Sequence, residues 1–243
     1  MAIPRRVALV TGAAQGIGKA IALRLARDGH HVGLNDLPSK RQALDEVAHL
    51  VEKNGVLAAT FPSDVTKEGD VQATVDGAAD ALGGLHVMVA NAAVLQAIPF
   101  LEETAQSFNR TTSVGSTGTF LCYKHAGRRM IAEGHREGRI IGASSFAGKR
   151  PASDLTSYSV AKFAVRSLTQ NAALALGPHG ITVNAYAPGL TDTTMGMVKA
   201  GYTLEGWAET VPMRRYALPD DIAALVSFLA SKEAGYITGA AMD

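Results

Sequence analysis

The 243-residue sequence predicts an α/β fold, a doubly wound parallel sheet of the Rossmann type in a single domain spanning residues 1–243. The first observation is that short apolar runs alternate with longer helical patterns, which favours a parallel sheet with right-handed crossovers and helices on both faces. The second is that the first apolar run leads directly into a glycine-rich loop and a helix. The third is that no repeat, low-complexity tract or linker divides the chain.

The expected strands are short, continuous apolar runs, as in buried parallel strands. The first, 7–10, is ended by Thr11-Gly12, and the first helical pattern, 17–28, is ended by Gly29. By the same criteria strands are expected at 7–10, 31–35, 56–61, 85–90, 139–143 and 181–185, and helices at 17–28, 39–53, 67–82, 102–134, 156–176 and 220–231. The segment 190–215 is irregular and long enough to form a substrate-binding loop.

The composition argues against several classes of protein. Lys and Arg number 23 against 22 Asp and Glu, and this balance provides no field for nucleic acid or an anionic membrane. The sequence has no run of about 18 apolar residues, so no membrane span is expected. The histidines are scattered, and no metal site is expected. Cys122, the only cysteine, is expected to be a small buried residue, and the protein is expected to be cytoplasmic.

The loop after the first expected strand reads Thr11-Gly12-Ala13-Ala14-Gln15-Gly16-Ile17-Gly18. Glycines at this point let the backbone turn sharply and let a pyrophosphate approach the amino end of the helix. Free N–H groups and the helix dipole favour an anion there. Three glycines alone are weak evidence, but their position between the first strand and the first helix predicts a dinucleotide site.

The second expected strand is followed by Asp36, at the distance where a carboxylate accepts hydrogen bonds from an adenosine ribose. A carboxylate would also repel a 2′-phosphate, so we expect NAD as the cofactor, with NADP less favoured. Lys40 and Arg41 keep NADP open. Asp36 could otherwise serve only to open the turn before Pro38 or to cap the next helix.

Tyr158 and Lys162 lie early in the helical pattern 156–176, and a spacing of four places the phenol and the ammonium on one helix face. A phenol has a pKa of about 10, and a neighbouring positive charge favours its ionised form. Ser144-Ser145 ends the preceding strand, at the sheet edge where doubly wound folds bind ligands. The Tyr-x-x-x-Lys pattern is common by chance, but this context predicts a catalytic group.

Together these elements resemble the short-chain dehydrogenase/reductase family, and the match runs from Arg6 to Gly239. The family's Tyr-x-x-x-Lys pair is met by Tyr158 and Lys162, and its catalytic serine by Ser145. Its Thr-Gly-x-x-x-Gly-x-Gly motif, its Asp-Val dipeptide, its altered Asn-Asn-Ala-Gly strand end and its Pro-Gly segment are also present. The cofactor-binding residues that the resemblance implies are Gly12, Gln15, Gly16, Ile17, Gly18, Asp36, Asp64, Val65, Asn91, Tyr158, Lys162, Pro188, Gly189, Thr191 and Thr193.

The resemblance implies hydride transfer between nicotinamide C4 and the carbon of a ketone or secondary alcohol. Tyr158 would act as general acid in reduction and general base in oxidation, and Ser145 would hydrogen-bond the substrate oxygen. Lys162 would hold the nicotinamide ribose and, with the charge of the oxidised ring, lower the pKa of the phenol. The long helix patterns at 102–134 and 156–176 resemble a family interface, so a homodimer or homotetramer is expected.

Two features depart from the family. Gly115 occupies the place of the fourth catalytic residue, an asparagine that helps to hold a proton-transfer water. Extra water or Ser116 could compensate, and slower turnover is expected. The residues Tyr236 to Gly239 resemble the start of the last strand, whose usual ending is missing because the sequence stops at Asp243. The last strand and one interface are therefore expected to be incomplete.

Two other functions remain open from the sequence: a cofactor-binding protein with weak or no turnover, and non-redox chemistry such as dehydration or epimerisation on the same fold. Gly115 and the short end favour the first, while Ser145, Tyr158 and Lys162 argue against it. The substrate is expected to be a modest, fairly apolar alcohol or ketone. Its pocket candidates, which could equally be ordinary packing, are Leu95, Ile98, Met195, Met197, Tyr202 and Trp207.

Overall fold

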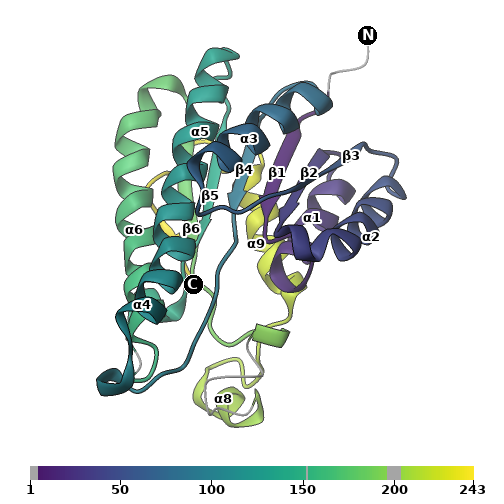
Figure 1. Ribbon diagram of the computed structural model, residues 1–243. Helices are drawn as coiled ribbons and strands as arrows, with labels where there is room; N and C mark the ends of the chain where they lie inside the picture. The colour runs from purple at the N-terminus through teal and green to yellow at the C-terminus, as the bar shows by residue number, and fades with distance from the viewer. Residues whose placement is uncertain (1–4, 152, 196–203) are drawn as a thin grey trace.

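The computed structural model describes residues 5–151, 153–195 and 204–243 and contains one parallel sheet flanked by helices (Figure 1). Its seven strands have the order β3-β2-β1-β4-β5-β6-β7, which confirms the doubly wound Rossmann-type fold in a single domain. The strands are β1 Val7–Thr11, β2 His31–Asp36, β3 Ala58–Pro62, β4 Val87–Ala90, β5 Arg139–Ala143, β6 Thr182–Tyr186 and β7 Ala241–Met242.

Helices cover both faces of the sheet and bury two apolar clusters (Figure 1). On one face α1 and α2 pack against β1 and β2, and α9 packs against β5 and β6. On the other face α3 packs against β1 to β3, and α5 and α6 pack against β4 to β6. Within the described residues the α-helices are α1 Gly16–Arg27, α2 Arg41–Glu52, α3 Glu68–Leu82, α4 Ala105–Thr112, α5 Gly118–Ala132, α6 Thr156–Leu176, α8 Leu204–Thr210 and α9 Pro219–Ala230. Because both faces are covered, the strands are apolar throughout, as the sequence predicts.

The order of the strands reverses beside β1, which pairs with β2 on one side and with β4 on the other. Val10 lies opposite Leu34 in β2 and Val89 in β4. The connections from these strands leave in opposite directions, and this opens a crevice at the carboxyl edge of the sheet. The glycine loop after β1 lies in this crevice.

The segment 102–134 is not one continuous α-helix, so this prediction was wrong in detail. A π-helical turn, Ser113–Thr117, separates α4 from α5. Single π turns occur frequently at functional sites, and Gly115 lies buried in this one. The local sequence predicts helix through the whole segment because a π turn differs from an α turn by only one residue.

The last strand also differs from its prediction. Residues 236–239 form no strand, and the strand is Ala241–Met242, whose two residues pair with Ala185 and Tyr186 of β6. The segment 190–215 is not wholly irregular either, because it contains α8, and Thr191 bridges to Ala217. Residues 196–203 of that segment lie outside the described residues.

Cys122 is a free, buried cysteine, and burial raises the pKa of its thiol to about 12. Both observations agree with the expected role as a small core residue. Within the described ranges, no helix is long and apolar enough to cross a membrane. The same part of the chain holds no cluster of three ligands for a metal ion.

Candidate active site

The glycine loop and the first turn of α1 form the wall of a groove at the carboxyl edge of the sheet. The groove is lined by Gly12, Gln15, Gly16, Ile17 and Gly18. The first N–H groups of a helix have no partner within the helix, and here no side chain caps them and no acid lies in the first turn. The loop therefore presents free donors and the positive end of the helix dipole to the groove, as an anionic phosphate requires.

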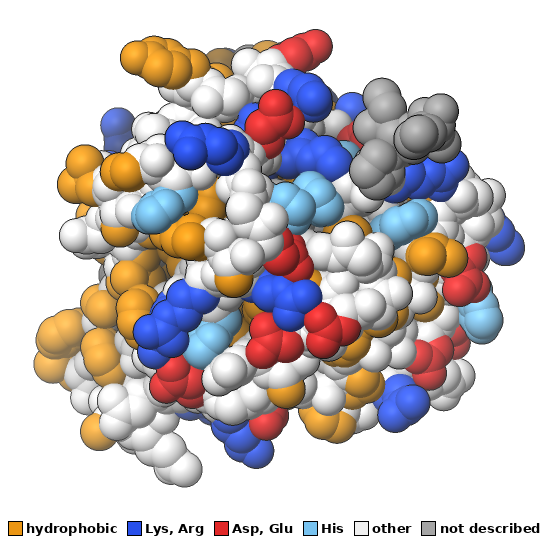
Figure 2. Space-filling view, turned by 90° about the horizontal axis from the view of Figure 1, so that it is seen from above, with side chains coloured by type: hydrophobic (Ala, Val, Ile, Leu, Met, Phe, Trp, Pro, Cys, Tyr) orange, Lys and Arg blue, Asp and Glu red, His pale blue; other side chains and the backbone are white. Residues whose placement is uncertain are grey.

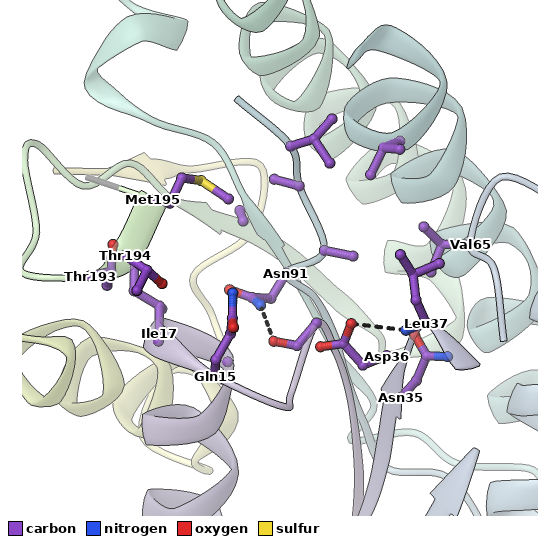
Figure 3. Close-up of a pocket in the computed structure, with 18 of the residues that line it drawn as sticks. Gln15, Ile17, Asn35, Asp36, Leu37, Val65, Asn91, Thr193, Thr194 and Met195 are labelled. Carbon is purple, nitrogen blue, oxygen red and sulfur yellow. Dashed lines mark hydrogen bonds between the residues drawn. The ribbon is translucent and has the colours of Figure 1, made fainter. Parts of the chain in front are cut away.

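Two of the glycines are required by close contacts. A Cβ on Gly18 would overlap the carbonyl oxygen of Gly12, and a Cβ on Gly12, whose φ is +65°, would lie 2.9 Å from Nδ2 of Asn91. Asn91 Nδ2 donates to the carbonyl oxygen of Thr11 at 2.8 Å. It also donates to the carbonyl oxygen of Gly12 at 3.2 Å (Figure 3). Asn91 therefore holds the loop in shape from β4 while it also lines the groove.

Asp36, at the end of β2, lines the same groove near Leu37 and Val65 (Figure 3). Its Oδ2 accepts the N–H of Ala14 at 3.0 Å and its Oδ1 accepts the N–H of Leu37 at 2.9 Å. Each carboxylate oxygen has two acceptor sites, so both retain capacity for a hydroxyl donor in the groove. Arg41, one of the two cations that would favour a 2′-phosphate, is paired with Asp45 at 3.8 Å.

The remaining sequence-predicted cofactor residues fall into two places. Asp64, Val65, Pro188 and Thr193 line the groove with the glycine loop. Gly189 and Thr191 instead line a second cavity that adjoins the groove. Figure 3 shows Thr193 on one side of the loop and Val65 on the other. An elongated ligand whose phosphates lie at the glycine loop would therefore extend to Thr193 on one side and to Val65 on the other. The groove thus has the form that a dinucleotide requires.

Ser145, Tyr158 and Lys162 meet where the two cavities join. Tyr158 lines both, Lys162 lines the groove, and Ser145 lines the second cavity. The ammonium of Lys162 lies 5.4 Å from the centre of the Tyr158 ring and donates to the carbonyl oxygen of Ala143 at 2.7 Å. Ser145 is held by accepting the N–H of Ala147 at 3.1 Å, in the turn that follows β5.

The electrostatics of this group differ from the expectation in one respect. Burial raises the pKa of Tyr158 above its usual 10, and a hydrogen bond with Ser145 opposes the rise. Burial lowers the pKa of Lys162 to about 8. The predicted lowering of the phenol pKa by Lys162 is thus not found in the protein alone, because desolvation disfavours the charged form of both groups.

The second cavity has a volume of about 310 Å³ and a mainly apolar lining. Leu95 and Met195 line it, as the sequence suggested, whereas Ile98 forms a bridge with Leu155 and does not line it. Met197, Tyr202 and the side chain of Trp207 lie outside the described part of the chain. A cavity of this kind beside a dinucleotide groove is suited to a small organic substrate.

Comparison with known proteins agrees with this geometry. A family model described as enoyl-(acyl carrier protein) reductase matches residues 12–243. A short-chain dehydrogenase/reductase of Armillaria gallica is 48% identical over 96% of this chain and 92% of its own. L-2,3-butanediol dehydrogenase of Corynebacterium glutamicum is 38% identical over 98% of this chain and 96% of its own. The crystal structure of NAD⁺-bound xylitol dehydrogenase matches with a TM-score of 0.90 at 32% identity, over 98% of this chain and 96% of that one.

The chain belongs to the short-chain dehydrogenase/reductase family. It is an oxidoreductase that transfers a hydride between a nicotinamide cofactor and an alcohol or ketone. The resemblance inferred from the sequence is confirmed, and the alternative of a cofactor-binding protein with weak or no turnover is not favoured.

Gly115 of this dehydrogenase lies against the helix that carries the catalytic pair. A Cβ on Gly115 would lie 2.9 Å from the Cβ of Ala161, which precedes Lys162. The carbonyl oxygen of Gly115 accepts the hydroxyl of Thr119 at 2.8 Å. The position that the family fills with asparagine is therefore closed by packing here, and a side chain would have to push the π turn and α6 apart.

Several residues of the dehydrogenase site were not found by sequence reasoning. Phe146, Arg150, Leu155 and Leu190 line the second cavity, and Tyr186 donates its hydroxyl to Oδ1 of Asn91 at 2.8 Å. The position of Phe146 and Arg150 within five residues after Ser145 is a usable signal, because a loop that follows a catalytic strand end faces the site. The sequence offers no comparable signal for Leu155, Leu190 or Tyr186.

Proposed function

We propose that Ser145, Tyr158 and Lys162 carry out the hydride exchange of this enzyme with a secondary alcohol or ketone held in the second cavity. The observation that carries this proposal is the position of Tyr158, which lines both the groove and the cavity. Its hydroxyl is hydrogen-bonded to Ser145, and the Lys162 ammonium lies one helical turn away.

In this scheme the substrate oxygen lies between the hydroxyls of Ser145 and Tyr158. Tyr158 donates its proton to that oxygen in reduction and removes it in oxidation. The Ser145 hydroxyl donates a hydrogen bond that stabilises the negative charge developing on the oxygen. The bound nicotinamide dinucleotide supplies or accepts the hydride. Lys162 holds its ribose and places a positive charge near the phenol.

We propose that the cofactor is NAD rather than NADP. The first turn of α1 and the glycine loop bind the pyrophosphate, through Gly12, Gln15, Gly16, Ile17 and Gly18. Asp36 accepts the ribose hydroxyls and repels a 2′-phosphate, while Asp64 and Val65 lie at the adenine. Asn91, Pro188 and Thr193 lie along the nicotinamide half, with Gly189 and Thr191 beside it.

A homodimer or homotetramer is proposed through the outer face of α5 and α6. Three large apolar side chains are unusually exposed there, Phe120 at 46%, Phe163 at 40% and Leu174 at 81%. Exposed apolar groups gathered on neighbouring helices mark an interaction surface. Light scattering on the purified protein measures the oligomeric state. The cytoplasmic location expected from the sequence remains a prediction.

The test of the catalytic proposal follows NADH absorbance with a panel of ketones and secondary alcohols, for the wild type and for Tyr158→Phe. Removal of the acid/base hydroxyl is expected to lower kcat by about 10²–10⁴-fold. Tyr236→Phe is the matched control, because Tyr236 is fully exposed and lies away from both cavities. A Tyr158→Phe variant that turns over as fast as the control would overturn the proposal.

A further inference from the structure

The second cavity contains one charged side chain among its described lining residues. Apart from Arg150, the lining consists of apolar, glycine, hydroxyl and phenol groups, and no Asp or Glu lines it. A guanidinium beside an apolar cavity without a carboxylate leaves the cavity mouth with an uncompensated positive charge.

The neighbouring cation shows that this arrangement is specific to Arg150. Lys149 is paired with Asp243 at 2.7 Å and donates to the carbonyl oxygen of Ala241 at 3.1 Å, and it does not line the cavity. Arg150 forms no ion pair with any described residue and is exposed. The two adjacent cations therefore have different surroundings: one fastens the turn to the last strand, and the other remains available to a ligand.

The backbone that carries Arg150 is fixed relative to the catalytic serine. The N–H of Arg150 donates to the carbonyl oxygen of Phe146 at 2.9 Å, and the N–H of Phe146 donates to the carbonyl oxygen of Pro188 at 2.9 Å. The carbonyl oxygen of Gly148 accepts from the guanidinium of Arg166 at 3.1 Å. The guanidinium of Arg150 is thus attached to a short, braced turn that starts at Ser145. Arg150 therefore lines the same cavity as Ser145, whose hydroxyl is proposed to bind the substrate oxygen.

We propose that Arg150 selects alcohols and ketones that carry a carboxylate, which it binds at the mouth of the second cavity while the reacting carbon lies at Tyr158. A single guanidinium matches the charge and the planar geometry of one carboxylate. A phosphate dianion is disfavoured because Arg150 is the only cation among the described residues of the lining. This inference rests on the proposed function, since it names the substrate class of the same site.

The test measures kcat and KM with NADH for 4-oxocyclohexanecarboxylate and for its methyl ester, which has the same ring but no charge. The wild type is expected to have a higher kcat/KM for the acid than for the ester. In Arg150→Met, which retains an apolar stem, the acid-to-ester ratio is expected to fall about tenfold through a higher KM for the acid. Arg150→Lys is expected to retain part of the preference, because it retains the charge.

Arg136→Met is the matched control, because Arg136 is an exposed arginine that lines neither cavity. Loss of the preference in Arg150→Met alone, with partial retention in Arg150→Lys, supports the inference. Turnover of both compounds with no preference for the acid, or an equal change in Arg136→Met, overturns the inference and leaves the proposed function standing. Turnover of neither compound, nor of any other ketone or alcohol, overturns the proposed function and this inference with it.

Discussion

The proposed preference for NAD depends on the charge of one side chain, Asp36, and this provides a quantitative prediction. Two unit charges 4 Å apart interact by about 4 kcal/mol at the effective dielectric of a protein surface. Asp36 is partly exposed, so salt and water reduce the repulsion of a 2′-phosphate to about 2–3 kcal/mol. At about 1.4 kcal/mol for each factor of ten, the wild type is expected to favour NADH over NADPH by roughly 30- to 150-fold in kcat/KM.

Asp36→Asn removes the charge but also disturbs the loop. The amide has one acceptor oxygen, whereas Asp36 accepts N–H groups of both Ala14 and Leu37. Loss of one of these hydrogen bonds is expected to weaken binding of both cofactors by about 1 kcal/mol. This common loss cancels in the ratio of NADH to NADPH activity, which is therefore the informative quantity. The ratio is expected to fall toward one.

Steady-state rates with each cofactor at fixed ketone concentration provide the measurement. Asp80→Asn is the control, because Asp80 lies on α3, pairs with Arg129 and does not line the groove. A faster reaction of the wild type with NADPH than with NADH, or an unchanged ratio in Asp36→Asn, would refute the role assigned to Asp36.

Two further predictions concern packing and pH. Gly115→Asn alone is expected to lower the free energy of unfolding by about 1–3 kcal/mol, because its Cβ would lie 2.9 Å from the Cβ of Ala161. In the double variant Gly115→Asn/Ala161→Gly that contact is removed, so the free energy of unfolding is expected to recover. Its kcat is expected to exceed that of the single variant Ala161→Gly. An unchanged kcat at every pH in the double variant would contradict a role for the missing asparagine. Burial, with the neighbouring His135 and Arg6, lowers the pKa of His86 to about 4. Between pH 6.5 and 4 the unfolded chain therefore binds more protons than the folded protein, and the free energy of unfolding falls as the pH falls through that window. Denaturant unfolding at pH 7 and pH 5 measures this loss of stability. Because His86 is half-buried, we expect His86→Gln to remove about 1–2 kcal/mol of the loss. The control is His49→Gln, because His49 is exposed, and an identical pH dependence in both variants would exclude His86 as the cause.

The His86 prediction belongs to the end of the molecule opposite the active site. The Nδ1 of His86 accepts the N–H of Val7 at 3.1 Å, and its ring centre lies 4.1 Å from that of His135. Figure 2 shows histidines interspersed with basic and acidic side chains on this end of the molecule, without a large area of one charge. A change of protonation here is expected to alter stability while leaving the groove and cavity unchanged.

The parts that sequence reasoning predicted correctly depend on local order in the chain. Gly18 is required by its contact with the Gly12 carbonyl oxygen within the turn from β1 to α1, and Gly12 by its φ of +65°, so a strand, a loop and a helix in sequence were enough to predict them. Tyr158 and Lys162 lie on one helix face through their spacing alone. Such features need no knowledge of how distant elements pack.

The features that were missed depend on contacts between distant segments. The π turn at 113–117 lies against Ala161 of α6, and a glycine in a helical pattern does not show which neighbour it touches. The last strand begins at Ala241 because its residues pair with β6, whereas local pattern favoured Tyr236 to Gly239. Leu155 and Leu190 come to one cavity from separate loops. Register and cavity shape are tertiary properties, and a single sequence carries little signal for them.

The pKa of Tyr158 depends both on local spacing in the sequence and on tertiary packing. Sequence spacing places Lys162 beside the phenol, but the structure shows that burial raises the pKa of Tyr158 and lowers that of Lys162. Both shifts favour neutral groups, since each charge would lack water. A protonated phenol is the form that donates to a ketone oxygen, so the protein alone is prepared for reduction. Alcohol oxidation requires a phenolate, and hence a further positive charge in the groove or a higher pH than reduction.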